Sequence, residues 1–114
     1  MIQQILDKHP EEAFPKNRQQ RIVAAAAPYQ QLKEKWAEKV PPGWYGFDLY
    51  DVPVRWLRII DEFLDYLADK DPNLEIHQIK LKYGSLRFYV NCDARFRDQI
   101  ALLEDTLYNS SLVY

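Results

Sequence analysis

The residues of this chain that could take part in covalent chemistry are one cysteine and two histidines. Cys92 is the only cysteine, and the histidines stand at positions 9 and 77. Strand alternation places His77 and Cys92 on one face, so a Cys/His pair is geometrically possible. Such a pair also needs an orienting group and an environment that favours the thiolate. Asp93 should point the other way, so a structural histidine and a small core cysteine are the favoured interpretation.

The sequence has few of the residues and motifs that other catalytic sites or metal sites require. One cysteine and two separated histidines cannot form a usual zinc site within one chain. There is no phosphate-binding loop, nucleophile elbow or dinucleotide fingerprint, and the chain has only three glycines with which to build one. Asp48 and Asp51 form a carboxylate pair, but paired acids in a loop usually serve turns and caps. We therefore expect no enzyme activity, no cofactor and no metal.

The strongest functional pattern is a group of cations in KLKYGSLRFYV, residues 80–90. In a hairpin, Lys80 lies opposite Arg87, and Lys82 and Tyr89 share their face. A like-charge pair directly across two strands destabilises a sheet by roughly a few tenths of a kcal/mol or more. The whole chain is slightly acidic, with net charge −2 and a pI of about 5.6, which argues against non-specific nucleic-acid binding.

A predicted helix at 54–68 carries acidic residues toward its end, against the preference of the helix dipole. They are Asp61, Glu62, Asp65 and Asp69. Two interpretations need no partner: the acidic helix and the basic hairpin face each other within the fold, or both are simply solvated. In the third, the hairpin binds an acidic partner surface and the helix a basic one, because locally unfavourable charges tend to occur at functional sites.

The scaffold follows from apolar periodicity. Helices are expected at 2–8, 17–40, 54–68 and 94–109, and strands at 75–82 and 85–91. Pro28 predicts a kink, while Asp51 is the expected N-cap of the third helix with Pro53 in its first turn. Because two strands alone are marginal, a third is expected from 44–50 or from a partner chain. The predicted class is α+β: three to four helices packed on one face of a small antiparallel hairpin or three-stranded sheet.

A two-residue loop, Tyr83-Gly84, sets the expected hairpin register. Lys82 faces Ser85, and the pairing continues through Lys80–Arg87 to His77–Val90. With this register the apolar pairs fall on one side and the polar pairs on the other, whereas a three-residue loop would scramble the two faces.

The aromatic stretch at 41–53 allows two interpretations. Trp44, Tyr45, Phe47 and Tyr50 could pack on the central helix and close the core. Exposed, Trp44 and Tyr45 would instead be interface anchors. A platform for single-stranded nucleic acid would use similar rings with a longer basic track.

The chain is expected to form a single domain over residues 1–114, with 1–40 as an N-terminal helical part. One cysteine permits no internal disulfide and suits a reducing compartment. The N-terminus is too polar for a secretory signal, and no window approaches the roughly 18–20 apolar residues of a membrane span. We expect a cytoplasmic protein with no membrane partner.

The order of motifs resembles a widespread family of small uncharacterised proteins of bacteriophage and prophage genomes. In that family a Gly-Trp starts a helix segment, and a hairpin resembling V-K-x-K-[FY]-G-G-L-R-F-Y follows. Gly43-Trp44 and residues 79–89 match these motifs, with Ser85 in place of the usual second glycine. The opening Leu6…His9-Pro10…Phe14 looks like the family's Leu…Tyr-Pro…Phe, whereas 17–40 match poorly. Many relatives continue into a cysteine-containing tail suggestive of metal binding, and this sequence ends at Tyr114.

The resemblance implies a phage or mobile-element protein made in a bacterial host cell. Small non-enzymatic phage proteins often bind a host protein, and inhibition of a defence system, including the anti-CRISPR type, is one version of that role. We expect the partner to be a host protein with an acidic surface. The expected binding residues are Lys80, Lys82, Arg87 and Tyr89, with Trp44 and Tyr45 as anchors. The alternatives are a nucleic-acid-associated protein using the same face, and a homodimer through a sheet edge.

Overall fold

The computed structural model describes residues 2–9, 17–49 and 52–111, with backbone alone at 108–111. The elements in chain order are α1 (Ile2–Lys8), α2 (Arg18–Trp36), β1 (Gly46–Asp48), α3 (Val54–Lys70), β2 (Glu75–Lys82), β3 (Ser85–Asn91) and α4 (Arg97–Ser111). Short 3-10 turns occupy Ala37–Lys39 and Ala94–Phe96. No helix within the described ranges is long and apolar enough to cross a bilayer.

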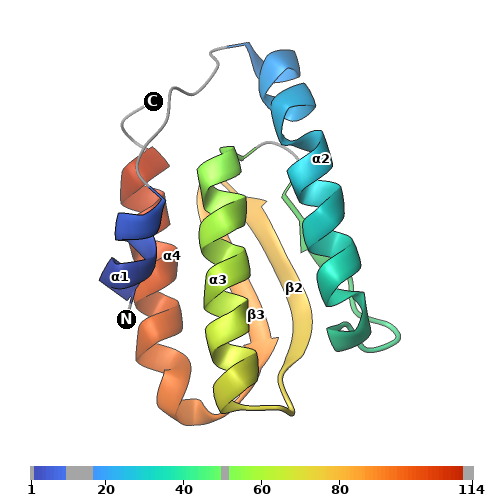
Figure 1. Ribbon diagram of the computed structural model, residues 1–114, viewed down its shortest axis with the longest axis vertical. Helices are drawn as coiled ribbons and strands as arrows, with labels where there is room; N and C mark the ends of the chain where they lie inside the picture. The colour runs from blue at the N-terminus through green and yellow to red at the C-terminus, as the bar shows by residue number, and fades with distance from the viewer. Residues whose placement is uncertain (1, 10–16, 50–51, 112–114) are drawn as a thin grey trace.

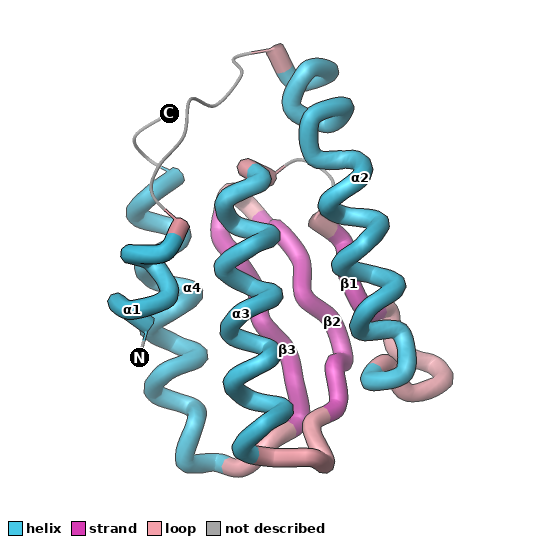
Figure 2. Tube along the Cα trace, in the orientation of Figure 1, coloured by secondary structure: helices cyan, strands magenta, loops and turns pink. Residues whose placement is uncertain are grey.

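The predicted α+β class is confirmed. The sheet has the strand order β1-β2-β3, and the helices lie on one of its faces, with α3 across the middle (Figures 1 and 2). β1 pairs with β2 in parallel, so the sheet is mixed rather than antiparallel throughout. The direction follows from connectivity, because α3 links β1 to β2 as a crossover and a crossover returns the chain in the same sense.

The hairpin register is confirmed from Lys82–Ser85 to Gln78–Tyr89. The expected His77–Val90 pair is wrong, because Val90 pairs with Ile76 and His77 is the extra residue of a β-bulge. The bulge changes the alternation, so that Ile76 and Ile79, three positions apart, are both fully buried. Burial of two large apolar side chains outweighs regular pairing at this point.

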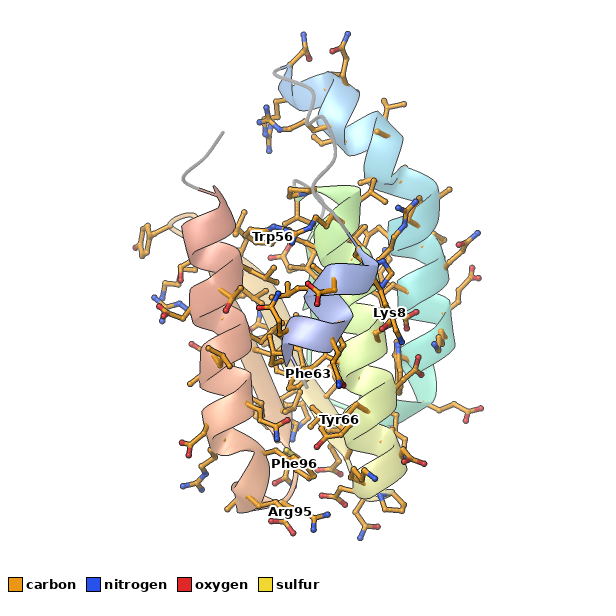
Figure 3. All side chains as sticks on the ribbon, turned by 60° about the vertical axis from the view of Figure 1, so that its left-hand side comes forward. Lys8, Trp56, Phe63, Tyr66, Arg95 and Phe96 are labelled. Atoms are coloured by element: carbon orange, nitrogen blue, oxygen red, sulfur yellow. The ribbon has the colours of Figure 1, made fainter. Side chains whose placement is uncertain are left out.

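The core is centred on α3. Seven of its side chains are buried, which confirms the wide apolar face: Trp56, Leu57, Ile59, Ile60, Phe63, Leu64 and Leu67. Phe63 reaches the hairpin, with its ring centroid 5.6 Å from that of Phe88. Tyr66 meets Phe96 edge to face at 5.8 Å, and Figure 3 shows Phe63, Tyr66 and Phe96 following one another between α3 and α4. The buried side chains join into one cluster.

The helix ends match the sequence pattern in part. Asn17 caps α2 by accepting a 2.8 Å hydrogen bond from the backbone of Gln19. α2 continues unbroken through Pro28, and Figure 3 shows its first part at an angle to the rest. Pro53 precedes α3 as its N-cap rather than lying in the first turn, and the expected cap Asp51 lies outside the described residues. Asp93 caps the turn before α4.

We predict that Phe63→Ala lowers the free energy of unfolding by about 3–5 kcal/mol, because it removes a buried ring from the contact between α3 and the hairpin. Urea denaturation followed by circular dichroism measures the change. Val23→Ala is the matched control, since Val23 is 64% exposed on α2 and should change stability by less than about 0.5 kcal/mol. Equal effects of the two substitutions would contradict the placement of the core.

Candidate functional site

The face of the sheet turned away from the helices is the candidate site. Paired residues share a side of the sheet, and those opposite to the buried Ile79, Leu86 and Phe88 point away from the core. We call this surface the open face. It consists of Asp48 on β1, Gln78, Lys80 and Lys82 on β2, and Ser85, Arg87 and Tyr89 on β3. All four predicted hairpin residues therefore lie on one surface.

The cations of the open face have no compensating ion pair among the residues that the structure describes. Lys80 and Arg87 are direct cross-strand partners, so the predicted like-charge pair is present. Within the described residues, neither they nor Lys82 makes a salt bridge. Arg87 Nε is buried and makes no hydrogen bond within the same ranges. Asp48 is paired in register with Lys80, and it offsets part of the positive charge through solvent.

The acidic residues of α3 have internal partners on the opposite side of the molecule. Lys35 of α2 lies 2.9 Å from Asp61 and 3.0 Å from Asp65, and Trp36 Nε1 donates to Asp61 at 2.9 Å. Partial burial of the Lys35 ammonium lowers its pKa, but its hydrogen bonds to the two carboxylates outweigh burial and leave the pKa raised.

Glu62 pairs instead with the end of α1. Its carboxylate lies 2.8 Å from His9 Nε2 and 3.6 Å from Lys8 Nζ. The interpretation that acidic helix and basic hairpin face each other is therefore wrong. Asp61, Glu62 and Asp65 are thus matched from α1, α2 and His9, and Asp69 lies beside Lys70 of α3 itself. Within the described residues, none of these acids pairs with a hairpin cation.

The aromatic stretch divides between core and surface. Phe47 packs against the core, whereas Trp44 and Tyr45 are 49% and 77% exposed. Trp44 stacks face to face on His77 with ring centroids 4.0 Å apart. Tyr50 lies outside the described residues. Trp44 and Tyr45 thus have the exposure that interface anchors need, at the end of the sheet away from the hairpin turn.

The bulge also alters the predicted relation between His77 and Cys92. His77 stacks on the exposed Trp44 rather than sharing a face with Ile79, which is buried in the core. Cys92 is half-buried against the core. Burial raises the pKa of the Cys92 thiol, and the nearby Asp71 and Asp93 raise it further, with Arg97 opposing them. This environment disfavours the thiolate that nucleophilic catalysis requires.

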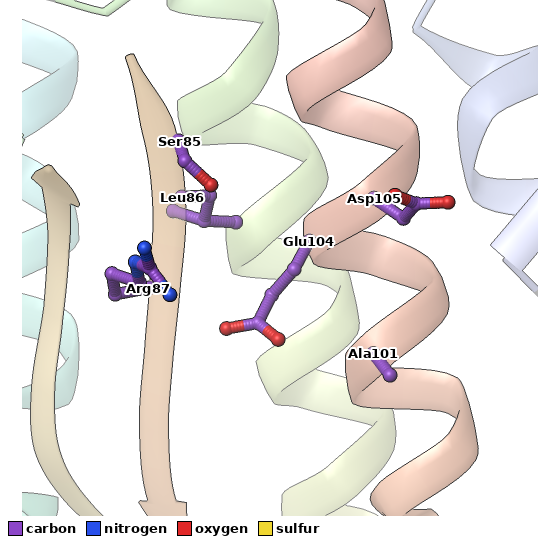
Figure 4. A pocket seen from close by; sticks show the side chains of 6 residues that line it. All are labelled: Ser85, Leu86, Arg87, Ala101, Glu104 and Asp105. Atoms are coloured by element: carbon purple, nitrogen blue, oxygen red, sulfur yellow. The ribbon is translucent and has the colours of Figure 1, made fainter. Parts of the chain in front are cut away.

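The free edge of β3 is covered by α4. The backbone N–H of Phe88 donates to Glu104 at 2.8 Å. A pocket of about 190 Å³ lies between the two elements, lined by Ser85, Leu86, Arg87, Ala101, Glu104 and Asp105. Figure 4 shows the Glu104 carboxylate turned toward β3. Because Glu104 occupies a donor that strand addition would use, this edge is poorly suited to pairing with a second chain.

Two residues of this region, Glu104 and Tyr83, were not among the functional residues predicted from the sequence. Glu104 lies far from β3 in the chain, and no local pattern indicates its hydrogen bond to Phe88. Tyr83 forms the hairpin turn with a φ of 54° and a side chain that is 91% exposed. The two-residue loop could have predicted the backbone conformation of Tyr83, because the turns that such loops favour need a positive φ at the first loop position.

No group of three potential metal ligands occurs among the described residues. Comparison of the chain with protein-family models, curated proteins and solved structures gives no match. The function must therefore be inferred from the chemistry of the open face and of the aromatic residues beside it.

We predict that iodoacetamide alkylates Cys92 more slowly in the native protein at pH 8 than in the urea-unfolded chain, because burial and the neighbouring acids raise the pKa of the thiol. Mass spectrometry of timed samples gives both rates. His77→Asn should leave the native rate unchanged, since His77 stacks on Trp44. A native rate above the unfolded rate, falling in His77→Asn, would restore the Cys/His pair.

Proposed function

We propose that this protein is a non-enzymatic binding module whose open face docks on an acidic surface of a partner protein. The observation that carries the proposal is the charge distribution. Three acids of α3 have partners on α1, on α2 or at His9, while Lys80 and Arg87 stand side by side. These acids are Asp61, Glu62 and Asp65. A partner carboxylate between them would relieve their repulsion and give Arg87 a charge-assisted hydrogen bond.

The rings beside the open face support a protein partner. Tyr89 is 48% exposed among the cations, and Trp44 and Tyr45 are exposed at the end of the sheet. Tyrosine, tryptophan and arginine are the residues most enriched at energetically important positions of protein interfaces. A flat sheet face with a few rings and cations has this composition.

A finer form of the proposal makes the partner a host protein of a bacterial defence system, blocked by occlusion of its surface in the manner of an anti-CRISPR protein. Its support is the resemblance of Gly43-Trp44 and of the hairpin at 79–89 to a phage and prophage family. The open face supplies the occluding surface in this form.

We predict that Lys80→Glu/Arg87→Glu weakens partner binding at least about tenfold, because it places carboxylates against an acidic surface. The variant keeps a like-charge pair between positions 80 and 87. It also brings carboxylates near Asp48 and near Glu104 and Asp105, so circular dichroism first checks that the variant is folded. The measurement is an affinity pull-down from nuclease-treated bacterial lysate, with the captured protein identified by mass spectrometry and its affinity then measured by calorimetry.

The matched control is Lys70→Glu/Arg97→Glu. It also exchanges one lysine and one arginine, and either variant changes the net charge from −2 to −6. Lys70 and Arg97 are exposed where α3 ends and α4 begins, at the end of the hairpin opposite its turn. Binding should survive in this control. Equal loss in both variants would indicate a general charge effect, and unchanged binding of the folded hairpin variant would refute the proposal.

A second candidate is binding of single-stranded nucleic acid, which the exposed rings of Trp44 and Tyr89 beside the cations favour. Asp48 on the same face opposes it. Fluorescence anisotropy with labelled oligothymidine at low salt separates the candidates. Contacts of three cations with phosphates would give a log–log salt slope of about −2. We expect no binding, and a steep salt dependence abolished by Lys80→Glu/Arg87→Glu would replace the first proposal by the second.

A further inference from the structure

The hairpin turn holds an unfavourable residue at its first position. Tyr83 and Gly84 have φ values of 54° and 75°, the sign that a type I′ turn requires at both positions. Asparagine, aspartate and glycine are the residues that tolerate this conformation, while an aromatic side chain is strained there. Among the described residues, Tyr83 is the only non-glycine residue with positive φ.

Packing does not offset this strain. The Tyr83 side chain is 91% exposed, more than any other large apolar side chain that the structure describes as exposed. The ring lies near its neighbour Lys82, whose Nζ is 5.7 Å from the ring centroid. Strained backbone that persists without local benefit is concentrated at binding and catalytic sites.

The turn continues the open face. Lys82 immediately precedes Tyr83, and Lys80 and Arg87 form the next polar pair along the strands. Trp44 differs from Tyr83 because its ring is stacked on a side chain of the protein itself, His77. Tyr83 is the most exposed of the large apolar side chains in the described part of the chain, and it lies at the turn of a hairpin whose open face is basic.

We propose that Tyr83 is the anchor of the interface and inserts into a pocket of the partner protein that fits a phenol ring and is bordered by carboxylates. The carboxylates around the partner's pocket are inferred from charge complementarity, since Lys80, Lys82 and Arg87 are left without ion pairs within the described residues. This inference rests on the proposed function, and it adds the specificity residue and the shape of the complementary site.

The first test is stability, for which a structural role and a binding role predict opposite signs. Tyr83→Asn places a favoured residue in the type I′ turn and should raise Tm by roughly 2–5 °C in a thermal scan. Tyr83→Phe keeps the ring and the strain, so its Tm should equal that of the wild type. A fall of Tm in Tyr83→Asn would show that the ring stabilises the fold and would overturn the inference.

The second test is affinity, with the protein identified in the pull-down and then purified as the probe. Tyr83→Asn should weaken its binding at least about 30-fold, the loss typical of a central anchor. Tyr83→Phe should retain most of the affinity. Val23→Gln is the control, since it also replaces an exposed apolar side chain with a polar one, on α2.

The outcomes separate the two proposals. If Lys80→Glu/Arg87→Glu abolishes binding and Tyr83→Asn does not, the anchor is refuted and the open face stands. If neither variant weakens binding, or no protein is captured, both proposals fail. A homodimer through the same surface is the remaining alternative, and analytical ultracentrifugation of the wild type alone tests it. A dimer that dissociates in Tyr83→Asn would show that Tyr83 binds a second copy of this chain rather than a partner protein.

Discussion

The contact between α3 and the inner face of the hairpin is the interaction on which the rest of the structure depends. A hairpin alone is marginally stable in water, and β1 adds only Gly46–Asp48 to it. Phe63 of α3 packs against Phe88 at 5.6 Å, and both strands bury apolar side chains beneath the helix. α3 is apolar over a wide arc, so α1, α2 and α4 can pack on its remaining sides. The Lys35–Asp61 salt bridge and the contact of His9 with Glu62 lie at the edges of this packing.

This arrangement places all the described helices on one side of the sheet and leaves the other side open. The free edge of β3 is not open in the same way, because Glu104 accepts the hydrogen bond of the Phe88 N–H. The opposite edge is limited to the three residues of β1. A partner that bound the open face would therefore meet side chains rather than a row of backbone groups, which favours recognition by charge and shape over strand addition.

The sequence predicted those features of the fold that depend on residues close together in the chain. The two-residue loop fixed the register near the turn, and the periodicity of 54–68 identified the buried face of α3. The bulge at His77 depends on burying both Ile76 and Ile79, a requirement set by the helix packed against them. The parallel direction of β1 depends on the crossover, and the pairing of Lys35 with Asp61 joins two helices. The bulge, the strand direction and the interhelical pair each depend on residues far apart in the chain, so a short stretch of sequence could not predict them.

Three unfavourable features lie close together on the hairpin. They are the Lys80–Arg87 pair, the unbonded Arg87 Nε and the positive φ of Tyr83. Two of them have a common substitution that would relieve the cost: a carboxylate at position 80 or 87 would turn repulsion into attraction, and asparagine at 83 would relax the turn. Two further polar atoms that are buried without a hydrogen bond within the described residues, Trp56 Nε1 and Gln99 Oε1, lie on α3 and α4. The proposed contact with an acidic partner would account for the persistence of the like-charge pair, because a partner carboxylate placed between Lys80 and Arg87 would remove the repulsion that the free protein bears.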